Sequence, residues 1–146
     1  MKYFSIEEMC KTDHKGIQNI PNDIQKNNLT ILINECLDKI RESYGGPINV
    51  SSGFRCAKLN EAVGGAKTSQ HERGQAADLK CADNKKLIQI IEKLGIYDQL
   101  IYEYGTDTQP GWVHVSYNKG KNRKQKLRKY SNDSRYYTVT NNWNVK

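Results

Sequence analysis

A long segment with helical periodicity, ended by two glycines and a proline, constrains the fold of this chain most strongly. Between Ile24 and Tyr44, apolar residues recur every three or four positions, which places them on one face of an α-helix. These residues are Leu29, Leu32, Ile33, Cys36, Leu37 and Ile40. The sequence Gly45-Gly46-Pro47 follows; a glycine suits a left-handed helix end, and a proline cannot continue a helix. The pattern predicts one amphipathic helix that packs on an apolar surface.

The remaining segments predict shorter helices and β-strands. Ser5 and Glu8 have the spacing of a capping box, and further helices are expected over residues 56–63 and 85–94. β-Rich runs occur at residues 48–50, 76–80, 99–104, 112–117 and 135–139. The third and fourth of these runs are joined by a glycine-bounded segment and predict a β-hairpin. The expected fold class is α+β, with helices packed on one small, mainly antiparallel sheet.

Length and composition favour a single domain over residues 1–146, in which the basic part from 119 to 146 is less ordered. A mean hydropathy of −0.83 indicates a modest core and a polar surface. No stretch approaches the roughly 18 apolar residues of a membrane span, and the N-terminus lacks the apolar core of a secretory signal. The even number of cysteines, four, permits disulfides, but without a secretory signal we expect reduced thiols. We also expect a monomer.

The net charge of +7 favours an anionic partner, which nucleic acid, a cell wall or a lipid surface would each provide. From Lys119 to Lys129 the chain carries seven lysines and arginines and no acid. This segment is either a solvated basic surface loop or helix end, or an anion-docking patch. Tyr117 and Tyr130 flank it, as in some single-strand binders, but no nucleic-acid motif is present. Such a function would also leave the histidines unexplained.

Two of the three histidines lie in a pattern that suits a metal ion. One is in Ser-x-His-x-x-Gly-x-Ala-x-Asp at residues 69–78, and the other is in Trp-x-His at residues 112–114. Zinc takes nitrogen and carboxylate ligands, and a catalytic zinc usually keeps a fourth position open beside three protein ligands. His71, Asp78 and His114 are therefore candidate ligands for one zinc ion. The third histidine, His14, is expected in a solvated loop.

These motifs together resemble the zinc D-Ala-D-Ala carboxypeptidase family, which includes phage L-alanyl-D-glutamate endopeptidases. Two further segments agree with it: Ser-Gly-Phe-Arg at residues 52–55 and Asn-x-x-Val-Gly-Gly at residues 60–65. The resemblance spans residues 4–120 and implies the hedgehog/DD-peptidase fold.

The resemblance implies a role for each matching residue. His71, Asp78 and His114 would bind one zinc ion, which lowers the pKa of its bound water. Arg55 would steady the carbonyl oxygen or a substrate carboxylate, because a guanidinium stays charged and donates in a fork. The alternative for Arg55 is a surface salt bridge. Ser69 either contacts substrate or turns the loop.

The chain departs from the family at the general base. Many members carry a carboxylate three residues before the last histidine, where this chain has Gly111. We predict that Glu103 is the base, because it lies on the strand expected to pair with the strand of His114. The alternative is that Glu103 supports a ligand or is an exposed strand residue. Asp98 and Glu72 are weaker candidates.

The resemblance therefore predicts a zinc metallopeptidase that hydrolyses peptidoglycan stem peptides, as a D,D-carboxypeptidase or an endopeptidase. Trp112 either binds substrate in the cleft or packs in the core. Anionic cell-wall polymers would be further partners of the basic surface. Without a secretory signal, the protein would be made in the cytoplasm and act on the wall after release, like a phage or prophage lysin. Gly111 keeps open a second function, a non-catalytic wall-binding module on the same zinc-binding fold.

Overall fold

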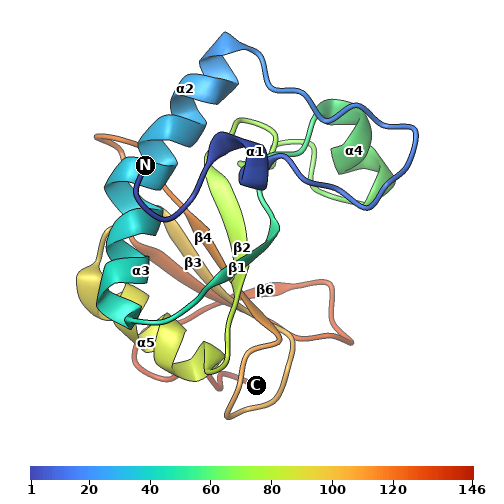
Figure 1. Ribbon diagram of the computed structural model, residues 1–146. Coiled ribbons are helices and arrows are strands. Elements are labelled where there is room, and N and C mark those ends of the chain that lie inside the picture. The colour runs from blue at the N-terminus through green and yellow to red at the C-terminus, as the bar shows by residue number, and fades with distance from the viewer.

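The computed structural model describes all residues 1–146, which form one six-stranded sheet and a group of helices (Figure 1). The helices are α1 (Ile6–Met9), α2 (Asp23–Leu32), α3 (Asp38–Tyr44), α4 (Ala57–Ala62) and α5 (Asn84–Leu94). The strands are β1 (Asn49–Ser52), β2 (Ala76–Lys80), β3 (Gln99–Glu103), β4 (Trp112–Ser116), β5 (Gln125–Lys129) and β6 (Tyr136–Thr138). A π-helical turn, η1 (Ile33–Leu37), joins α2 to α3. The predicted α+β class is confirmed.

The sheet has the strand order β1-β2-β4-β3-β5-β6. Neighbouring strands are antiparallel, except that β5 runs parallel to β3. The predicted hairpin is confirmed, since β3 pairs with β4 and Glu103 lies opposite Trp112. Because β4 also pairs with β2, the two strands that carry Asp78 and His114 are direct neighbours.

The predicted amphipathic helix is also confirmed, with one irregular turn. Asn22 and Gln25 form a reciprocal capping box at its start, and Gly45 ends it with a φ of 77°. The π-helical turn in the middle was not expected from a 3.6-residue period. The apolar residues of this stripe are nevertheless fully buried along the whole length of the helix. They are Leu29, Leu32, Ile33, Cys36, Leu37 and Ile40.

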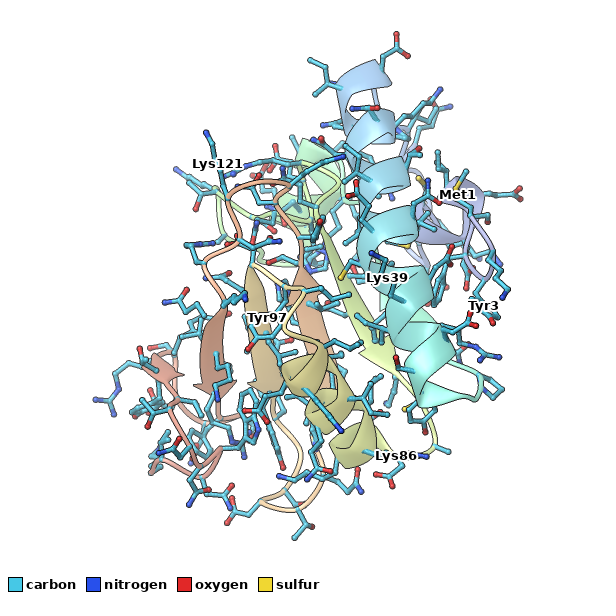
Figure 2. All side chains as sticks on the ribbon, turned by 90° about the vertical axis from the view of Figure 1, so that its left-hand side faces the viewer. Met1, Tyr3, Lys39, Lys86, Tyr97 and Lys121 are labelled. Carbon is cyan, nitrogen blue, oxygen red and sulfur yellow. The ribbon has the colours of Figure 1, made fainter.

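The two faces of the sheet differ in chemistry, because side chains alternate along each strand. One face packs against α2, α3 and α5, which lie in front of the strands in Figure 2. Its strand residues are fully buried; they are Leu79, Leu100, Tyr102, Val113 and Val115. The opposite face carries Asp78, His114, Glu103 and Trp112 at matching positions of β2, β3 and β4. The candidate site residues on the sheet therefore lie on the face away from the helical layer.

The basic segment contains a strand that the sequence pattern did not predict. Residues 125–129 form β5 rather than a solvated loop or a helix end. The expected β-run at 135–139 is confirmed as β6, which pairs with β5. Val139 and Trp143, beyond β6, are buried in the same hydrophobic core as the long helix. The C-terminal part thus extends the sheet beside β3.

Candidate metal centre

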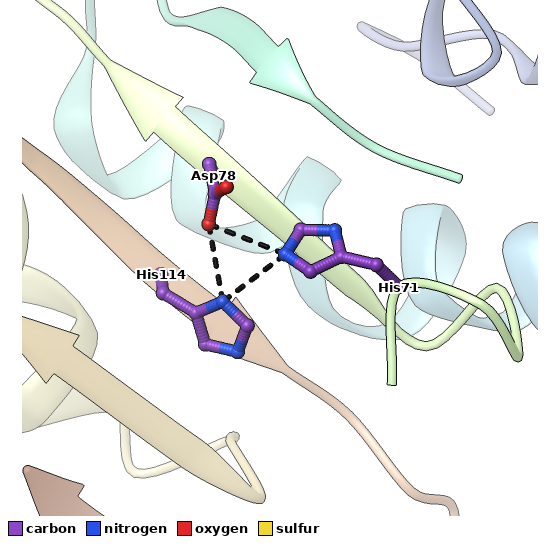
Figure 3. Close-up of side chains that lie close together, drawn as sticks. All are labelled: His71, Asp78 and His114. Atoms are coloured by element: carbon purple, nitrogen blue, oxygen red, sulfur yellow. Dashed lines mark hydrogen bonds and ion pairs between the residues drawn. The ribbon is translucent and has the colours of Figure 1, made fainter. Parts of the chain in front are cut away.

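Three separate elements bring His71, Asp78 and His114 together. His71 lies in the turn-rich loop before β2, Asp78 lies in β2, and His114 lies directly opposite Asp78 on β4. The Nδ1 atom of His114 is 3.1 Å from Oδ1 of Asp78. The Nε2 atom of His71 is 3.4 Å from the same oxygen and 3.3 Å from Nδ1 of His114 (Figure 3). Three ligand atoms on buried side chains therefore converge on one point.

This arrangement fits a zinc ion. Ligands at about 2.0–2.2 Å from a tetrahedral ion lie about 3.4 Å from one another. The separations of 3.1, 3.3 and 3.4 Å match that spacing. Two imidazole nitrogens and one carboxylate oxygen are also a donor set that zinc prefers.

A backbone carbonyl fixes the ring of His71. Nδ1 of His71 lies 2.7 Å from the carbonyl oxygen of Gly53, and since that oxygen only accepts, Nδ1 carries the proton. The lone pair of Nε2 is therefore directed at Asp78 and His114, as is usual for a metal-binding histidine. Gly53 has no room for a side chain, because a Cβ there would lie 2.4 Å from the carbonyl oxygen of Met9.

The loop that carries His71 is held by α2. Gln25 and Asn28 each donate a side-chain amide proton at 2.9 Å to a carbonyl of the loop. Gly74 passes so close to α2 that a Cβ would lie 2.6 Å from the carbonyl oxygen of Gln25, and its φ is 76°. The hydroxyl of Ser69 accepts a hydrogen bond from the backbone N–H of His71 at 3.2 Å. This bond agrees with one of the two roles expected for Ser69, that of shaping the turn of the loop.

Three side chains that can carry positive charge surround Asp78, namely His71, His114 and Arg55. Burial alone would raise its pKa, but the charges and hydrogen bonds that His71 and His114 supply when their rings carry both protons outweigh this and hold the pKa well below its usual range. Nη2 of Arg55 lies 3.8 Å from Oδ2 of Asp78, and Nη1 donates to Asn60 at 3.2 Å. The guanidinium of Arg55 is thus part of the site wall and not a surface ion pair.

Glu103 lies beside the three candidate ligands. The indole N–H of Trp112 donates to Oε2 of Glu103, and burial followed by the charge of Asp78 raises the pKa of this carboxyl group. Gly111 is part of the tight connection of the hairpin, where its N–H donates to the carbonyl oxygen of Glu103 at 2.9 Å. With no side chain at Gly111, Glu103 is the carboxylate that the hairpin directs toward the site.

A cleft of about 680 Å³ runs over the three candidate ligands. All seven residues singled out in the sequence line it, namely Arg55, Ser69, His71, Asp78, Glu103, Trp112 and His114. Of the weaker candidates, Asp98 also lines the cleft and is paired with Arg123. Glu72 lies outside the cleft lining and accepts a hydrogen bond from Asn60 at 3.4 Å.

The structure adds aromatic residues that sequence reasoning missed. Tyr104 and Tyr136 line the cleft at the same end as Trp112, and Tyr104 meets Trp112 edge to face with ring centroids 4.8 Å apart. Tyr104 directly follows Glu103 in an apolar run, a signal that was available. Tyr136 offered no such signal, because its approach depends on the unpredicted strand β5.

The basic segment is largely neutralised by ion pairs within the protein. Four of its cations lie within 4.0 Å of a carboxylate oxygen; the pairs are Lys119–Glu35, Arg123–Asp98, Lys126–Glu92 and Arg128–Asp107. The segment is therefore not one continuous free patch. None of the helices combines the length and the apolar character that crossing a bilayer requires.

Comparison with known proteins agrees with the geometry of the site. The family model described as peptidase M15 matches residues 2–116, which is well over half of the chain and includes all three candidate ligands. No curated protein matches the chain significantly. The match confirms the resemblance carried by the histidine, aspartate and arginine motifs. The chain belongs to the peptidase M15 family, that of the zinc D-Ala-D-Ala carboxypeptidases.

Proposed function

We propose that the protein is a zinc metallopeptidase that hydrolyses peptide bonds in the stem peptides of peptidoglycan, in the manner of a phage lysin. The observation that carries this is the convergence of His71, Asp78 and His114 below an open cleft in a chain of a peptidase family. The family supports a metallopeptidase. The choice of peptidoglycan as substrate rests on the family resemblance and on the net charge of +7, which suits an anionic wall.

The three ligands would hold zinc through Nε2 of His71, Nδ1 of His114 and the carboxylate of Asp78. Bound zinc supplies polarisation of the peptide carbonyl and a lowered pKa of water. Glu103 takes the proton from the attacking water and returns it to the nitrogen of the leaving amine. Trp112 holds Oε2 of Glu103, which leaves the other carboxylate oxygen to accept this proton.

The cleft walls orient the peptide. Arg55 donates to a carbonyl oxygen or carboxylate of the substrate, at a position fixed by its bond to Asn60. The N-x-x-V-G-G segment keeps this pair in place, because a Cβ at Gly65 would lie 2.0 Å from Oδ1 of Asn60. Ser69 and Trp112 contribute the neighbouring wall surfaces.

Digestion of peptidoglycan of defined chemotype, followed by mass spectrometry of the products, tests this function and identifies the bond. The purified protein should release D-alanine or peptide fragments. His71→Ala should abolish both hydrolysis and stoichiometric zinc binding, whereas His14→Ala, at an exposed histidine far from the motif, should change neither. Hydrolysis that persists in His71→Ala would contradict the proposal.

One observation favours a second function, a wall-binding module without turnover. Gly111 stands where many family members carry their catalytic carboxylate. In that case the wild-type protein would sediment with peptidoglycan sacculi and bind zinc but release no product at any pH. Substitution of Glu103 would then leave binding unchanged.

A further inference from the structure

The C-terminal strand contributes a side chain to the cleft. Pairing across four strands aligns Trp112 on β4, Glu103 on β3, Lys129 on β5 and Tyr136 on β6. Side chains at matched positions of neighbouring strands point to the same face of a sheet. Tyr136 therefore lies on the same face as Glu103, and it lines the cleft with it.

Tyr136 lines the cleft, and its hydroxyl group has no hydrogen-bond partner within the protein. Tyr137, its neighbour, donates its hydroxyl proton to Asp133, and the hydroxyl of Tyr130 accepts two backbone N–H groups. Tyr136 makes no such bond, and the residue is 54% exposed. Burial raises its pKa, and the negative charges of Glu103 and Asp78 raise it further. The phenol is therefore a protonated donor that lines the same cleft as the candidate metal centre.

Arg55 and Tyr136 enter the cleft lining from opposite edges of the sheet. Arg55 follows β1, one edge strand, and Tyr136 belongs to β6, the other. Both line the same cleft, and the positive charge of Arg55 is the one influence that opposes the rise of the pKa of Tyr136. A peptide bound above His71, Asp78 and His114 would therefore have a guanidinium on one side and a phenol on the other.

The geometry points to Tyr136 as a catalytic residue supplied by the C-terminal strand: its hydroxyl donates a hydrogen bond to the oxygen of the scissile peptide carbonyl, from the side opposite Arg55. This inference rests on the proposed function. The carbonyl oxygen gains negative charge when water adds to the carbon, so the bond strengthens on the way to the transition state. Tyr136 lies beyond residues 2–116, so this donor is outside the part of the chain that the family model matches.

Two features hold the ring for this role. The strand β6 is paired with β5, and the ammonium group of Lys129 lies 5.8 Å from the centroid of the Tyr136 ring and 5.5 Å from that of Tyr104. A lysine between two rings limits how far the phenol can turn away. The hydroxyl itself supports nothing else, so its removal leaves the fold intact.

Tyr136→Phe removes the hydroxyl and keeps the ring. On zinc-saturated protein, kcat should fall by about 10²–10³-fold, as for loss of one donor to a developing oxyanion, and KM should change by less than about threefold. Zinc affinity and Tm should equal those of the wild type. Tyr137→Phe is the matched control, because its hydroxyl bonds to Asp133 outside the cleft lining, and its kcat should be unchanged.

A binding measurement separates this inference from the proposed function. Phosphinate analogues of D-Ala-D-Ala and of L-Ala-D-Glu carry a tetrahedral anion in place of the reacting carbonyl. By calorimetry, zinc-loaded Tyr136→Phe should bind the preferred phosphinate about tenfold or more weakly than the wild type, while the unmodified dipeptide binds equally to both. Equal phosphinate affinity in the variant, or no phosphinate binding by the wild type, overturns the role of Tyr136. If the wild type binds phosphinate but cleaves no peptidoglycan, the proposed function fails while the phosphinate comparison still decides the role of Tyr136.

Discussion

At the scale of single residues, Glu103 has the surroundings that a proton-transferring carboxylate needs. Burial and the charge of Asp78 raise its pKa, and the indole of Trp112 holds one of its oxygens. A raised pKa brings a carboxyl group closer to the pH at which it both accepts and returns a proton. With Gly111 in place of a carboxylate, Glu103 is the carboxylate that the paired strand of the hairpin presents to the proposed zinc site.

Glu103→Gln should lower kcat by about 10²–10⁴-fold, because the amide keeps the shape but cannot take a proton at neutral pH. Zinc stoichiometry should stay at the wild-type value, since Glu103 is not among the three candidate ligands. Glu72→Gln is the control, because that carboxylate lies outside the cleft lining. Full activity of Glu103→Gln, with zinc bound, would assign the base elsewhere.

The backbone carbonyl of Gly53 fixes the orientation of the ring of His71, one of the three candidate ligands. Gly53→Ala places a Cβ 2.4 Å from the carbonyl oxygen of Met9, so the backbone must move, and with it the carbonyl that accepts the proton of His71. Loss of such a support typically costs about 10–100-fold in metal affinity. We expect a weakening of that size in chelator competition. Gly46→Ala, at a glycine whose would-be Cβ meets only the ring of Tyr44, should keep the wild-type affinity.

At the scale of elements, β5 shows where the sequence pattern stops being informative. Gln125-Lys126-Leu127-Arg128-Lys129 contains one apolar residue, so no alternation marks it as a strand. The strand exists because Arg128 is buried between the rings of Tyr102 and Tyr130, with its guanidinium carbon 3.9 and 4.2 Å from their centroids. Its Nη1 donates to the carbonyl of Tyr104 at 3.0 Å. These partners lie elsewhere in the chain, and no local pattern reveals them.

Arg128→Met should therefore lower the free energy of unfolding by about 2–4 kcal/mol, from unpaired carbonyls and lost ring contacts. Lys121→Met, at an exposed cation of the same basic segment, should stay within about 0.5 kcal/mol of the wild type. Urea denaturation followed by circular dichroism measures both. Equal effects of the two substitutions would mean that Arg128 acts only through its charge.

The same reasoning separates what the sequence predicts of the site from what it does not. His71, Asp78 and His114 were found because few residue types bind zinc and their spacing is distinctive. Glu103 was placed near them because a hairpin fixes cross-strand partners. Tyr136 was missed because its position is set by two strand pairings in series, β3 with β5 and β5 with β6. Because β5 was not predicted from the sequence, the position of β6 beside it, and with it the approach of Tyr136 to the cleft, could not be predicted either.

At the scale of the whole molecule, Asp98 connects the C-terminal part of the chain to the part that carries the candidate metal centre. Its carboxylate is 1% exposed and accepts the backbone N–H, Nε and Nη2 of Arg123 at 2.7, 2.9 and 2.8 Å. It also accepts Nε2 of Gln70 at 2.8 Å, directly before His71 in the chain. One buried carboxylate thus joins the start of β3, the loop of His71 and the basic segment.

This junction predicts a pH dependence of stability with a definite sign. Burial opposes ionisation of Asp98, but the hydrogen bonds from Arg123 and Gln70 outweigh it and lower the pKa of Asp98. A group whose folded pKa is depressed stabilises the protein above its unfolded pKa, about 3.9 for aspartate, and loses that contribution as the pH falls through its folded pKa.

The substitution Asp98→Asn tests this sign. It sets an amide N–H against the donors of Gln70 or Arg123 and should lower the free energy of unfolding by about 1–3 kcal/mol near pH 7. In urea titrations the difference between wild type and variant should shrink as the pH is lowered below about 4. Glu61→Gln, at an exposed carboxylate for which no ion pair forms, should show no such trend. A difference for Asp98→Asn that stays constant from neutral pH to about pH 2 would mean that shape, and not charge, joins the C-terminal part to the site.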